Sequence, residues 1–174
     1  MMSDQTFNFD CTQWEKYFVL LKKAGNGEFK KAIAEWFDAC GYEFLDAVQN
    51  EIINRHVVDT RLLLHSFTKG DKNNVWKISD GGLTLEVGTN LEYSEYVNDG
   101  HWTCKKGESS RWVPGYWSGD RFTYDPGAKT GMLLKQKWIE GYHYWEAAVR
   151  IFSRVFRASM EKKMRQWGDE FFKR

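Results

Sequence analysis

The sequence contains little proline and cysteine, and it has no long hydrophobic run. Only two proline and three cysteine residues occur among 174 positions. Cys11, Cys40 and Cys104 are odd in number and far apart, which disfavours a disulfide framework or a four-ligand zinc site and predicts reduced thiols. Because no run of about 18 uncharged apolar residues occurs, and residues 1–10 lack the pattern of a signal peptide, we expect a soluble protein made in a cytoplasm.

An excess of charge of one sign is also missing. The chain has 25 basic and 24 acidic side chains, which excludes a strongly basic nucleic-acid scaffold and an acidic disordered tail. The distribution is uneven: residues 1–56 carry six basic and nine acidic groups, residues 57–135 ten of each, and residues 136–174 nine and five. The two ends are therefore complementary in charge, and they can pair within one subunit or between copies.

Apolar and aromatic residues are plentiful, at 42% and 17% of the chain, which is enough to bury a core. In three segments the apolar residues recur at the three- and four-residue steps of an amphipathic helix. This spacing predicts helices over residues 12–21, 28–55 and 144–171. Gly25-Asn26-Gly27 is typical of a turn before the second helix. Gly41 weakens the middle of that helix, where we expect a bend.

In the middle of the chain, apolar and polar residues alternate, as is typical of β-strands. Residues 75–78 and 83–87 flank a glycine-containing turn and predict a first hairpin. Residues 111–117 and 121–124 predict a second hairpin around Ser118-Gly119-Asp120. The polar segment 98–110 between the two hairpins is predicted to be a loop.

The order helix, helix, strands, helix predicts an α+β fold. Long N- and C-terminal helices are expected to pack on one face of a small antiparallel β-sheet, with an extended aromatic hairpin. Asp125-Pro126-Gly127 is expected to close the β-rich part with a turn. At this length we expect a single domain over residues 1–174, made of N-terminal helices (1–56), a β-rich centre (57–135) and a C-terminal helix (136–174).

Combinations of chemically reactive side chains are sparse. His101 and Cys104 have metal-ligand spacing, but no further nitrogen or sulfur ligand is adjacent in the sequence. Acid and base groups without a nucleophile motif gather at Asp125, Glu140, His143 and Glu146. We therefore expect no catalytic, metal or cofactor site, and a small hydrolase with two facing carboxylates is kept as an alternative.

Six large aromatic residues fall within 23 positions of the β-rich centre. Strand alternation places aromatic side chains on both faces of the second hairpin. Two interpretations are equally favoured: one face covers the long helices, or the hairpin forms a protein interface, where Trp, Tyr and Arg dominate the binding energy. A platform on which carbohydrate rings stack is a third, less favoured interpretation. The candidate interface residues are Trp112, Tyr116, Trp117 and Phe122.

Arg150, Arg154 and Arg157 share one face of the predicted last helix. Such a stripe can neutralise phosphates, so a nucleic-acid-binding module is an alternative function. Glu146 and Glu161 dilute the positive charge, and an arginine face also suits paired hydrogen bonds to carboxylates. We favour a protein partner over nucleic acid.

Two segments resemble a known family. Residues 58–66, VDTRLLLHS, resemble the pattern V-D-T-G-x-L-x-x-S, and residues 87–100, VGTNLEYSEYVNDG, resemble V-G-T-N-x-x-Y-A-x-Y-V-x-x-G. Both are similar to the tail-completion, or neck, family that joins heads to tails in tailed bacteriophages, prophages and phage-tail-like particles. Arg61 stands where the first pattern has Gly, and Ser94 where the second has Ala. The residues that carry the resemblance are Asp59, Thr60, Gly88, Thr89, Asn90, Tyr93, Tyr96 and Gly100.

The two motifs also predict local structure. The first predicts a short helix from Arg61, capped by Asp59 or Thr60, in which Leu62 and Leu63 are buried. The second predicts that a strand ends at Gly88-Thr89-Asn90 and that a second short helix follows. The side chains of this helix expected to face the sheet are Tyr93, Tyr96 and Val97.

The resemblance implies a structural assembly protein rather than an enzyme. It implies a tail-completion or neck ring component that joins the tail tube or sheath to the terminator or head connector. The implied partners are these neighbouring proteins and further copies of the chain, in rings of sixfold or twelvefold symmetry, a hexamer among them. Assembly is expected in the bacterial host cytoplasm, and the final location is the neck of a virion or tail particle. Neither a membrane nor a small-molecule substrate is expected as a partner.

Overall fold

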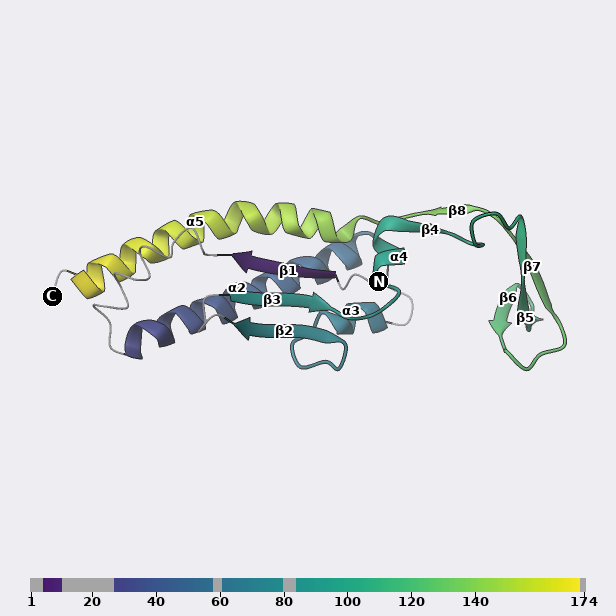
Figure 1. Cartoon of the computed structure of the whole chain (residues 1–174), viewed down its shortest axis with the longest axis horizontal. Coiled ribbons are helices and arrows are strands. Elements are labelled where there is room, and N and C mark those ends of the chain that lie inside the picture. Colours follow the sequence, from purple (N-terminus) through teal and green to yellow (C-terminus); the bar gives the residue numbers. More distant parts are fainter. Residues whose placement is uncertain (1–4, 11–26, 58–60, 80–83, 173–174) are drawn as a thin grey trace. The chain divides into compact units, whose positions relative to one another are not determined.

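The computed structural model describes residues 5–10, 27–57, 61–79 and 84–172 (Figure 1). The chain forms two compact units. Unit 1 consists of residues 1–95 and 143–174, and unit 2 of residues 96–142. This division does not test whether residues 1–174 behave as one domain, so the single domain with its three segments stays a prediction. Within the described ranges, no helix is both long and apolar enough to cross a membrane.

Unit 1 contains a three-stranded antiparallel sheet with the order β1-β3-β2. Its strands are β1 (Gln5–Asp10), β2 (Asn74–Ser79) and β3 (Thr84–Thr89). Trp76 pairs with Val87, which confirms the pairing of the first predicted hairpin. The turn of that hairpin lies outside the described residues. β1 was not predicted, and it pairs with β3 along its whole length.

Two long helices accompany this sheet. α2 (Gly27–Asn54) and α5 (Tyr144–Phe172) confirm the helices predicted over 28–55 and 144–171, whereas the helix predicted over 12–21 lies outside the described residues. α2 runs behind the sheet in the view of Figure 1. Together with the antiparallel strands, these helices confirm the predicted α+β class.

Aromatic rings join α2 to α5 within one subunit. Trp36 stacks on Phe156 at a centroid distance of 5.3 Å. Phe44 is fully buried and lies edge to face with Trp145 at 5.2 Å and with Phe152 at 5.3 Å. Such aromatic pairs contribute about 0.5–1.5 kcal/mol each beyond the area they bury. The acidic and basic helices thus pack in the same chain through an apolar contact, which leaves their charged outer faces exposed.

Gly41 allows α2 to approach the sheet. The helix continues through Gly41, and the predicted bend there stays a prediction. A Cβ atom at this position would collide with the ring of Trp76 and would lie 2.9 Å from Cδ2 of Leu85. The absence of a side chain therefore makes room for the Trp76 ring.

The first motif forms the short helix α3 (Leu62–Ser66). Leu63 is buried as predicted, whereas Leu62 is 39% exposed, so the prediction that Leu62 is buried is wrong. A five-residue helix has a single inward side, which Leu63 and Ser66 occupy. Arg61 precedes the helix with φ 61°, a left-handed conformation, and makes no side-chain cap bond. The predicted caps Asp59 and Thr60 lie outside the described residues.

Unit 2 is built from strands. β4 (Gly100–Trp102) pairs with β8 (Trp138–Glu140) as a two-stranded ribbon. A separate three-stranded sheet has the order β6-β5-β7. Its strands are β5 (Ser110–Ser118), β6 (Arg121–Tyr124) and β7 (Gly131–Lys135). The boundary with unit 1 falls inside the short helix α4 (Ser94–Asp99).

The loop predicted over 98–110 is partly wrong, because Asn98 and Asp99 end α4 and residues 100–102 form β4. β4 depends on a partner strand far along the chain, a pairing that a local pattern does not reveal. The predicted turn at Asp125-Pro126-Gly127 is confirmed. There the N–H of Ala128 donates to the carbonyl of Asp125 at 3.1 Å.

Candidate interaction surface

The second predicted hairpin is confirmed as β5 and β6, and β5 is the central strand of the three-stranded sheet. β5 pairs with β6 only through residues 115–118 and with β7 only through residues 110–114. Gly119 and Asp120 connect β5 to β6, and Gly119 has φ 60°, which a two-residue hairpin turn requires. At Gly115 the partner of β5 changes from β7 to β6. The Thr130 hydroxyl donates to the Gly115 carbonyl at 2.8 Å and fixes the backbone at this point.

Large apolar side chains lie exposed on one face of this sheet. Cross-strand partners point to the same face, so Trp112 lies beside Leu133 of β7, and Tyr116 lies further along β5 on the same side. Trp112 is 57% exposed and Tyr116 50%, and Leu133 is exposed to a similar extent. We call Trp112, Tyr116 and Leu133 the aromatic face.

The opposite face is aromatic as well. It carries Trp117, which is 56% exposed, the exposed Tyr124 and the half-buried Phe122. The rings of Trp117 and Phe122 meet edge to face at a centroid distance of 5.2 Å. The expectation of aromatic residues on both faces of the hairpin therefore agrees with the structure.

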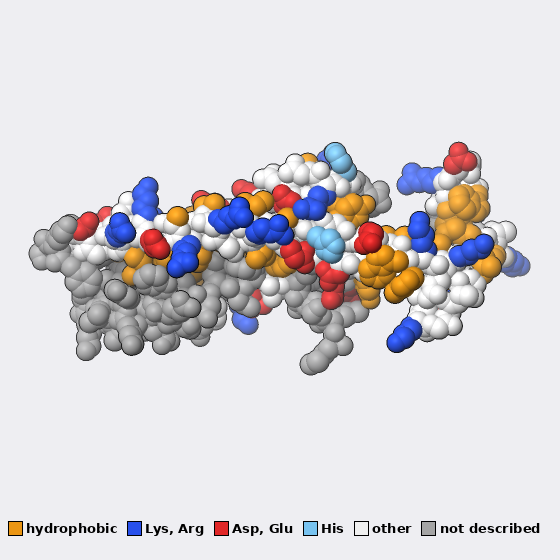
Figure 2. All heavy atoms as spheres, turned by 90° about the horizontal axis from the view of Figure 1, so that it is seen from above, with side chains coloured by type: hydrophobic (Ala, Val, Ile, Leu, Met, Phe, Trp, Pro, Cys, Tyr) orange, Lys and Arg blue, Asp and Glu red, His pale blue; other side chains and the backbone are white. Residues whose placement is uncertain are grey.

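Unit 2 buries almost none of its apolar side chains. Among the described residues, Cys104 is the one apolar side chain of unit 2 that is buried in the core. Of the large apolar side chains that are exposed in the described ranges, more than half belong to this unit, and Figure 2 shows hydrophobic side chains on its surface. Monomeric soluble proteins rarely expose contiguous apolar patches of several hundred Å² without an interaction that covers them.

The arginine row is exposed on α5, in unit 1. Arg150, Arg154 and Arg157 are all exposed, and Figure 2 shows Lys and Arg side chains along this helix. Arg157 forms an ion pair with Glu161, with 3.8 Å between Nε and Oε1, and its side chain is 87% exposed. The predicted interface residues thus belong to different units: the hairpin residues to unit 2 and the arginines to unit 1.

Thr89 gives a physical reason for the second motif. Its hydroxyl donates to the Asn73 carbonyl at 3.1 Å and accepts the N–H of Leu91 at 3.1 Å. The N–H of Asn90 donates to the same Asn73 carbonyl at 3.0 Å. Gly88 accepts a hydrogen bond from the side-chain amide of Asn74 at 3.0 Å. These motif residues connect the end of β3 to the start of β2, which is a structural role.

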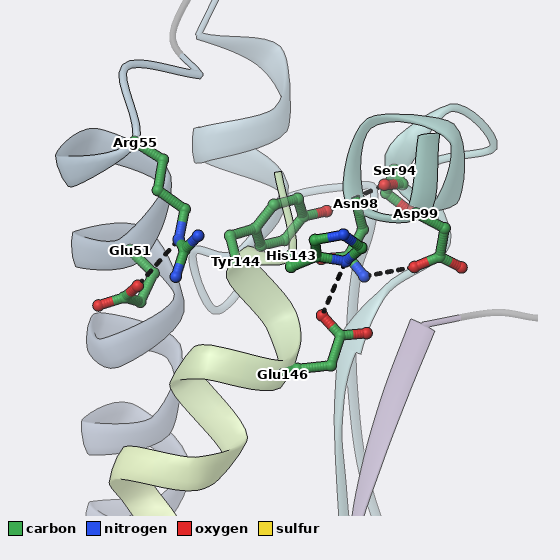
Figure 3. Close-up of polar contacts among 8 residues, drawn as sticks. All are labelled: Glu51, Arg55, Ser94, Asn98, Asp99, His143, Tyr144 and Glu146. Atoms are coloured by element: carbon green, nitrogen blue, oxygen red, sulfur yellow. Dashed lines mark hydrogen bonds and ion pairs between the residues drawn. The ribbon is translucent and has the colours of Figure 1, made fainter. Parts of the chain in front are cut away.

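Tyr93 and Tyr96 are exposed, so the prediction that they face the sheet is wrong. α4 instead buries Ser94 and Asn98. The Tyr144 hydroxyl donates to the Ser94 carbonyl at 3.1 Å, and within unit 2 the Asn98 amide donates to the Asp99 carboxylate at 2.6 Å (Figure 3). Hydrogen bonds compensate for burying these polar groups, and apolar spacing does not reveal them.

Gly100 is required by the backbone at the start of β4. It has φ 87°, and an added Cβ would lie 2.5 Å from the Ile139 carbonyl oxygen. The ring of Trp138 would lie 2.8 Å away. Both the left-handed conformation and the close strand pairing therefore favour glycine here.

Three of the residues considered for metal binding or catalysis contact other polar groups of the chain. His101 Nδ1 lies 3.3 Å from the Tyr96 carbonyl oxygen. The buried Cys104 thiol donates to the Leu134 carbonyl at 3.3 Å. His143 Nδ1 lies 4.0 Å from Glu146 Oε2, and both side chains are at least half exposed (Figure 3). This last pair lies at the start of α5, where an acidic residue is favourable.

Sequence reasoning missed Leu133 as part of the surface because β7 was not predicted. Met132, Leu133 and Leu134 form a short apolar run that is a signal for a strand. A run this short does not show which strand it pairs with. Only the strand register shows that Leu133 lies beside Trp112.

Comparison with known proteins identifies relatives of this chain. A family model described as "Bacteriophage HK97-gp10, putative tail-component" matches residues 20–100. "Uncharacterized protein YqbI" of Bacillus subtilis (strain 168) is 47% identical over 161 residues, which cover 91% of this chain and 96% of that protein. "Phage-like element PBSX protein XkdI" of the same organism is 49% identical over 147 residues, 84% of this chain and 90% of that protein. No solved structure matches.

Proposed function

Because the chain belongs to the HK97-gp10-like family of phage tail components, we propose that it completes the upper end of a phage-type tail. In this role it is a neck ring component that joins the tail tube or sheath to the terminator or head connector. It assembles in the cytoplasm of the bacterial host and ends in the neck of the virion or tail particle. A contractile tail, in which a sheath is among the neighbours of this chain, is part of the proposal.

The exposed aromatic surface of unit 2 is the observation that carries this proposal. Trp112, Tyr116 and Trp117 are each at least half exposed, on a sheet whose two faces both carry open apolar side chains. Large amphipathic rings of this kind are the residues that dominate binding energy at protein interfaces. In the proposed role they anchor the hairpin, together with Phe122, against a neighbouring subunit or tail protein.

A ring needs two different patches on each copy. One patch must meet a different patch on the next copy, because identical patches would close a dimer instead. The exposed arginines Arg150, Arg154 and Arg157 are suited to pair with carboxylates across such an interface. The chain thus offers an apolar and a basic surface to its neighbours.

The location of the chain in an assembled particle tests the proposal. The gene would be deleted from the phage or prophage that encodes the chain and replaced by an epitope-tagged copy. Electron microscopy of the deletion should show tails that are not joined or not closed at the upper end, and cryo-EM of the complemented particle should show this chain there as a ring. Normal tails in the deletion, or density for the chain at the opposite end of the tail, would contradict the proposed function.

Trp117 tests the role of the hairpin. Trp117→Ala should weaken association with the neighbouring protein by about 2 kcal/mol or more if Trp117 is a binding hot spot. Particle yield would fall while the urea midpoint of the isolated chain stays close to wild type, because the side chain is exposed in the monomer. An unchanged particle yield with a destabilised monomer would assign Trp117 to the core instead.

A further inference from the structure

One exposed face of α5 combines arginines with apolar side chains. Arg150 and Arg154 are one helical turn apart, and Ile151 and Val155 follow them at the next positions. Ile151 and Val155 are about half exposed. Ala158 continues the face and is exposed. We call these five residues the α5 stripe.

A complementary face lies on α2. Ala39, Glu43, Asp46, Asn50 and Ile53 recur at three- and four-residue steps, and all five are exposed. We call them the α2 stripe. Its two carboxylates contrast with three other acidic groups of this helix: Glu35, Asp38 and Glu51 each form an ion pair with a lysine or arginine.

The charges of the two stripes have no partners within the described part of the chain. Glu43 and Asp46 make no ion pair among these residues, and neither do Arg150 and Arg154. Along a helix axis Glu43 and Asp46 are about 4.5 Å apart, and Arg150 and Arg154 about 6 Å apart. The two sets therefore have similar spacing, and one arginine can reach each carboxylate when the helices lie side by side.

The apolar parts of the stripes also match. Ala39 and Ala158 are small enough to let two helices approach to the usual interaxial distance of about 8–10 Å. Ile151, Val155 and Ile53 supply apolar surface around the charges, which reduces the exposure of the ion pairs to solvent and strengthens them. A purely basic partner surface would be attracted to the α2 stripe but would leave these apolar side chains uncovered.

We propose that the α5 stripe of one copy packs on the α2 stripe of the next copy. This inference rests on the proposed function, because it names the contact between copies that closes the proposed ring. The contact is heterologous, since the two stripes are different surfaces of the same chain. Arg150 and Arg154 pair with Glu43 and Asp46, while the aromatic face of unit 2 stays available for a different neighbour.

Charge reversal in the full-length chain tests this contact in solution. Sedimentation velocity and native mass spectrometry would follow self-association at low and high salt. Arg154→Glu alone and Asp46→Lys alone should each lower the association constant at least about tenfold, because each places like charges opposite one another. An equimolar mixture of the two variants should associate again, since the introduced glutamate of one variant then meets the introduced lysine of the other. Lys72→Glu makes the same charge change in the turn before β2, outside both stripes and outside the aromatic hairpin, and should leave self-association unchanged.

Each other outcome overturns the proposal. A full-length chain that stays monomeric at every concentration and salt would exclude a second copy as the occupant of the stripes. Self-association that ignores both reversals, or that the mixture does not restore, would assign the contact to other surfaces. Assembly that stops at two copies would contradict a heterologous contact. Electron microscopy of the particles reports on the proposed tail role separately, so a chain found in the neck that fails these solution tests retains its function and loses only this interface.

Discussion

Units 1 and 2 differ in how far they bury their apolar side chains. In unit 1, α2, α5 and the sheet enclose a core of interlocking rings such as Phe44 and Phe152. In unit 2, Trp112 and Trp117 point to opposite faces of a thin sheet, and both are more than half exposed. Side-chain packing therefore stabilises unit 1, whereas backbone hydrogen bonds and close backbone contacts define unit 2.

The difference supports the proposal that unit 2 binds a neighbouring protein. A small sheet with three strands and open faces has little apolar burial to oppose its conformational entropy. The apolar area left open in unit 2 is available for a neighbour, and association would complete its core. The following predictions test this contrast, from the largest expected effect to the smallest.

Phe44→Ala and Trp112→Ala compare the two units directly. Removing the fully buried Phe44 ring should lower the free energy of unfolding by about 3–5 kcal/mol, because it leaves a cavity between α2 and α5. Trp112→Ala should change it by about 0.5 kcal/mol or less, as exposed substitutions usually do. Equilibrium urea unfolding measures both. Similar losses for the two variants would mean that Trp112 is part of a core after all.

Gly141→Ala tests whether backbone contacts hold unit 2. An added Cβ would collide with the backbone of Asn98, Asp99 and Gly100, which cannot move aside as a side chain can. We expect a local cost of about 2 kcal/mol and about 30-fold faster amide exchange in residues 96–142. The control is Gly127→Ala, whose Cβ would meet its nearest neighbour at 3.5 Å. Equal acceleration of exchange in unit 1 would show that the two units open together.

Lys69→Ala tests a polar contribution to unit 1. Lys69 Nζ lies 4.0 Å above the Trp76 ring and 4.9 Å from the Tyr42 ring, and 3.2 Å from Oδ1 of Asp38. Loss of the cation–π and ionic contacts should cost about 1 kcal/mol of unfolding free energy. Lys31→Ala, which removes a far more exposed ion pair, should cost less. If the two variants lose the same stability, the aromatic rings contribute nothing to the binding of Lys69.

Arg61→Gly should have the smallest effect and the opposite sign. Arg61 has φ 61°, which costs an L-residue about 1–2 kcal/mol and glycine much less. Glycine loses about 0.5–1 kcal/mol through its greater freedom in the unfolded chain, so the net gain is about 0.5 kcal/mol. Differential scanning calorimetry should show a Tm rise of about 1–2 °C. A lower Tm would show that the Arg61 side chain makes a contact worth more than the backbone strain.

The regular elements were predictable because their signals are local. The apolar period predicted α2 and α5, and a short turn between alternating residues predicted the β5–β6 hairpin. The sequence also showed that Arg61 stands where the family pattern has glycine. The left-handed conformation of Arg61 explains why glycine is favoured at this position. β1, β4, β7 and β8 were missed because each is short and pairs with a strand outside its own neighbourhood in the sequence.

The orientation of side chains in the short helices was the weakest part of the prediction. Leu62, Tyr93 and Tyr96 were expected inside and are exposed, while Ser66, Ser94 and Asn98 are buried. A helix of one or two turns has no long stripe to identify its inner face. Its orientation depends on hydrogen bonds to distant residues, such as the bond from Tyr144 to Ser94.

By itself, the sequence determined the positions of the long helices and of the aromatic hairpin, and its motifs identified the family. These properties depend on neighbouring residues, since helical period, strand alternation and turn chemistry act over a few positions. Only the tertiary structure decided which apolar residues are buried. Burial requires a second element to pack against the first, so the same kinds of aromatic side chain are core on α2 and α5 and surface on β5.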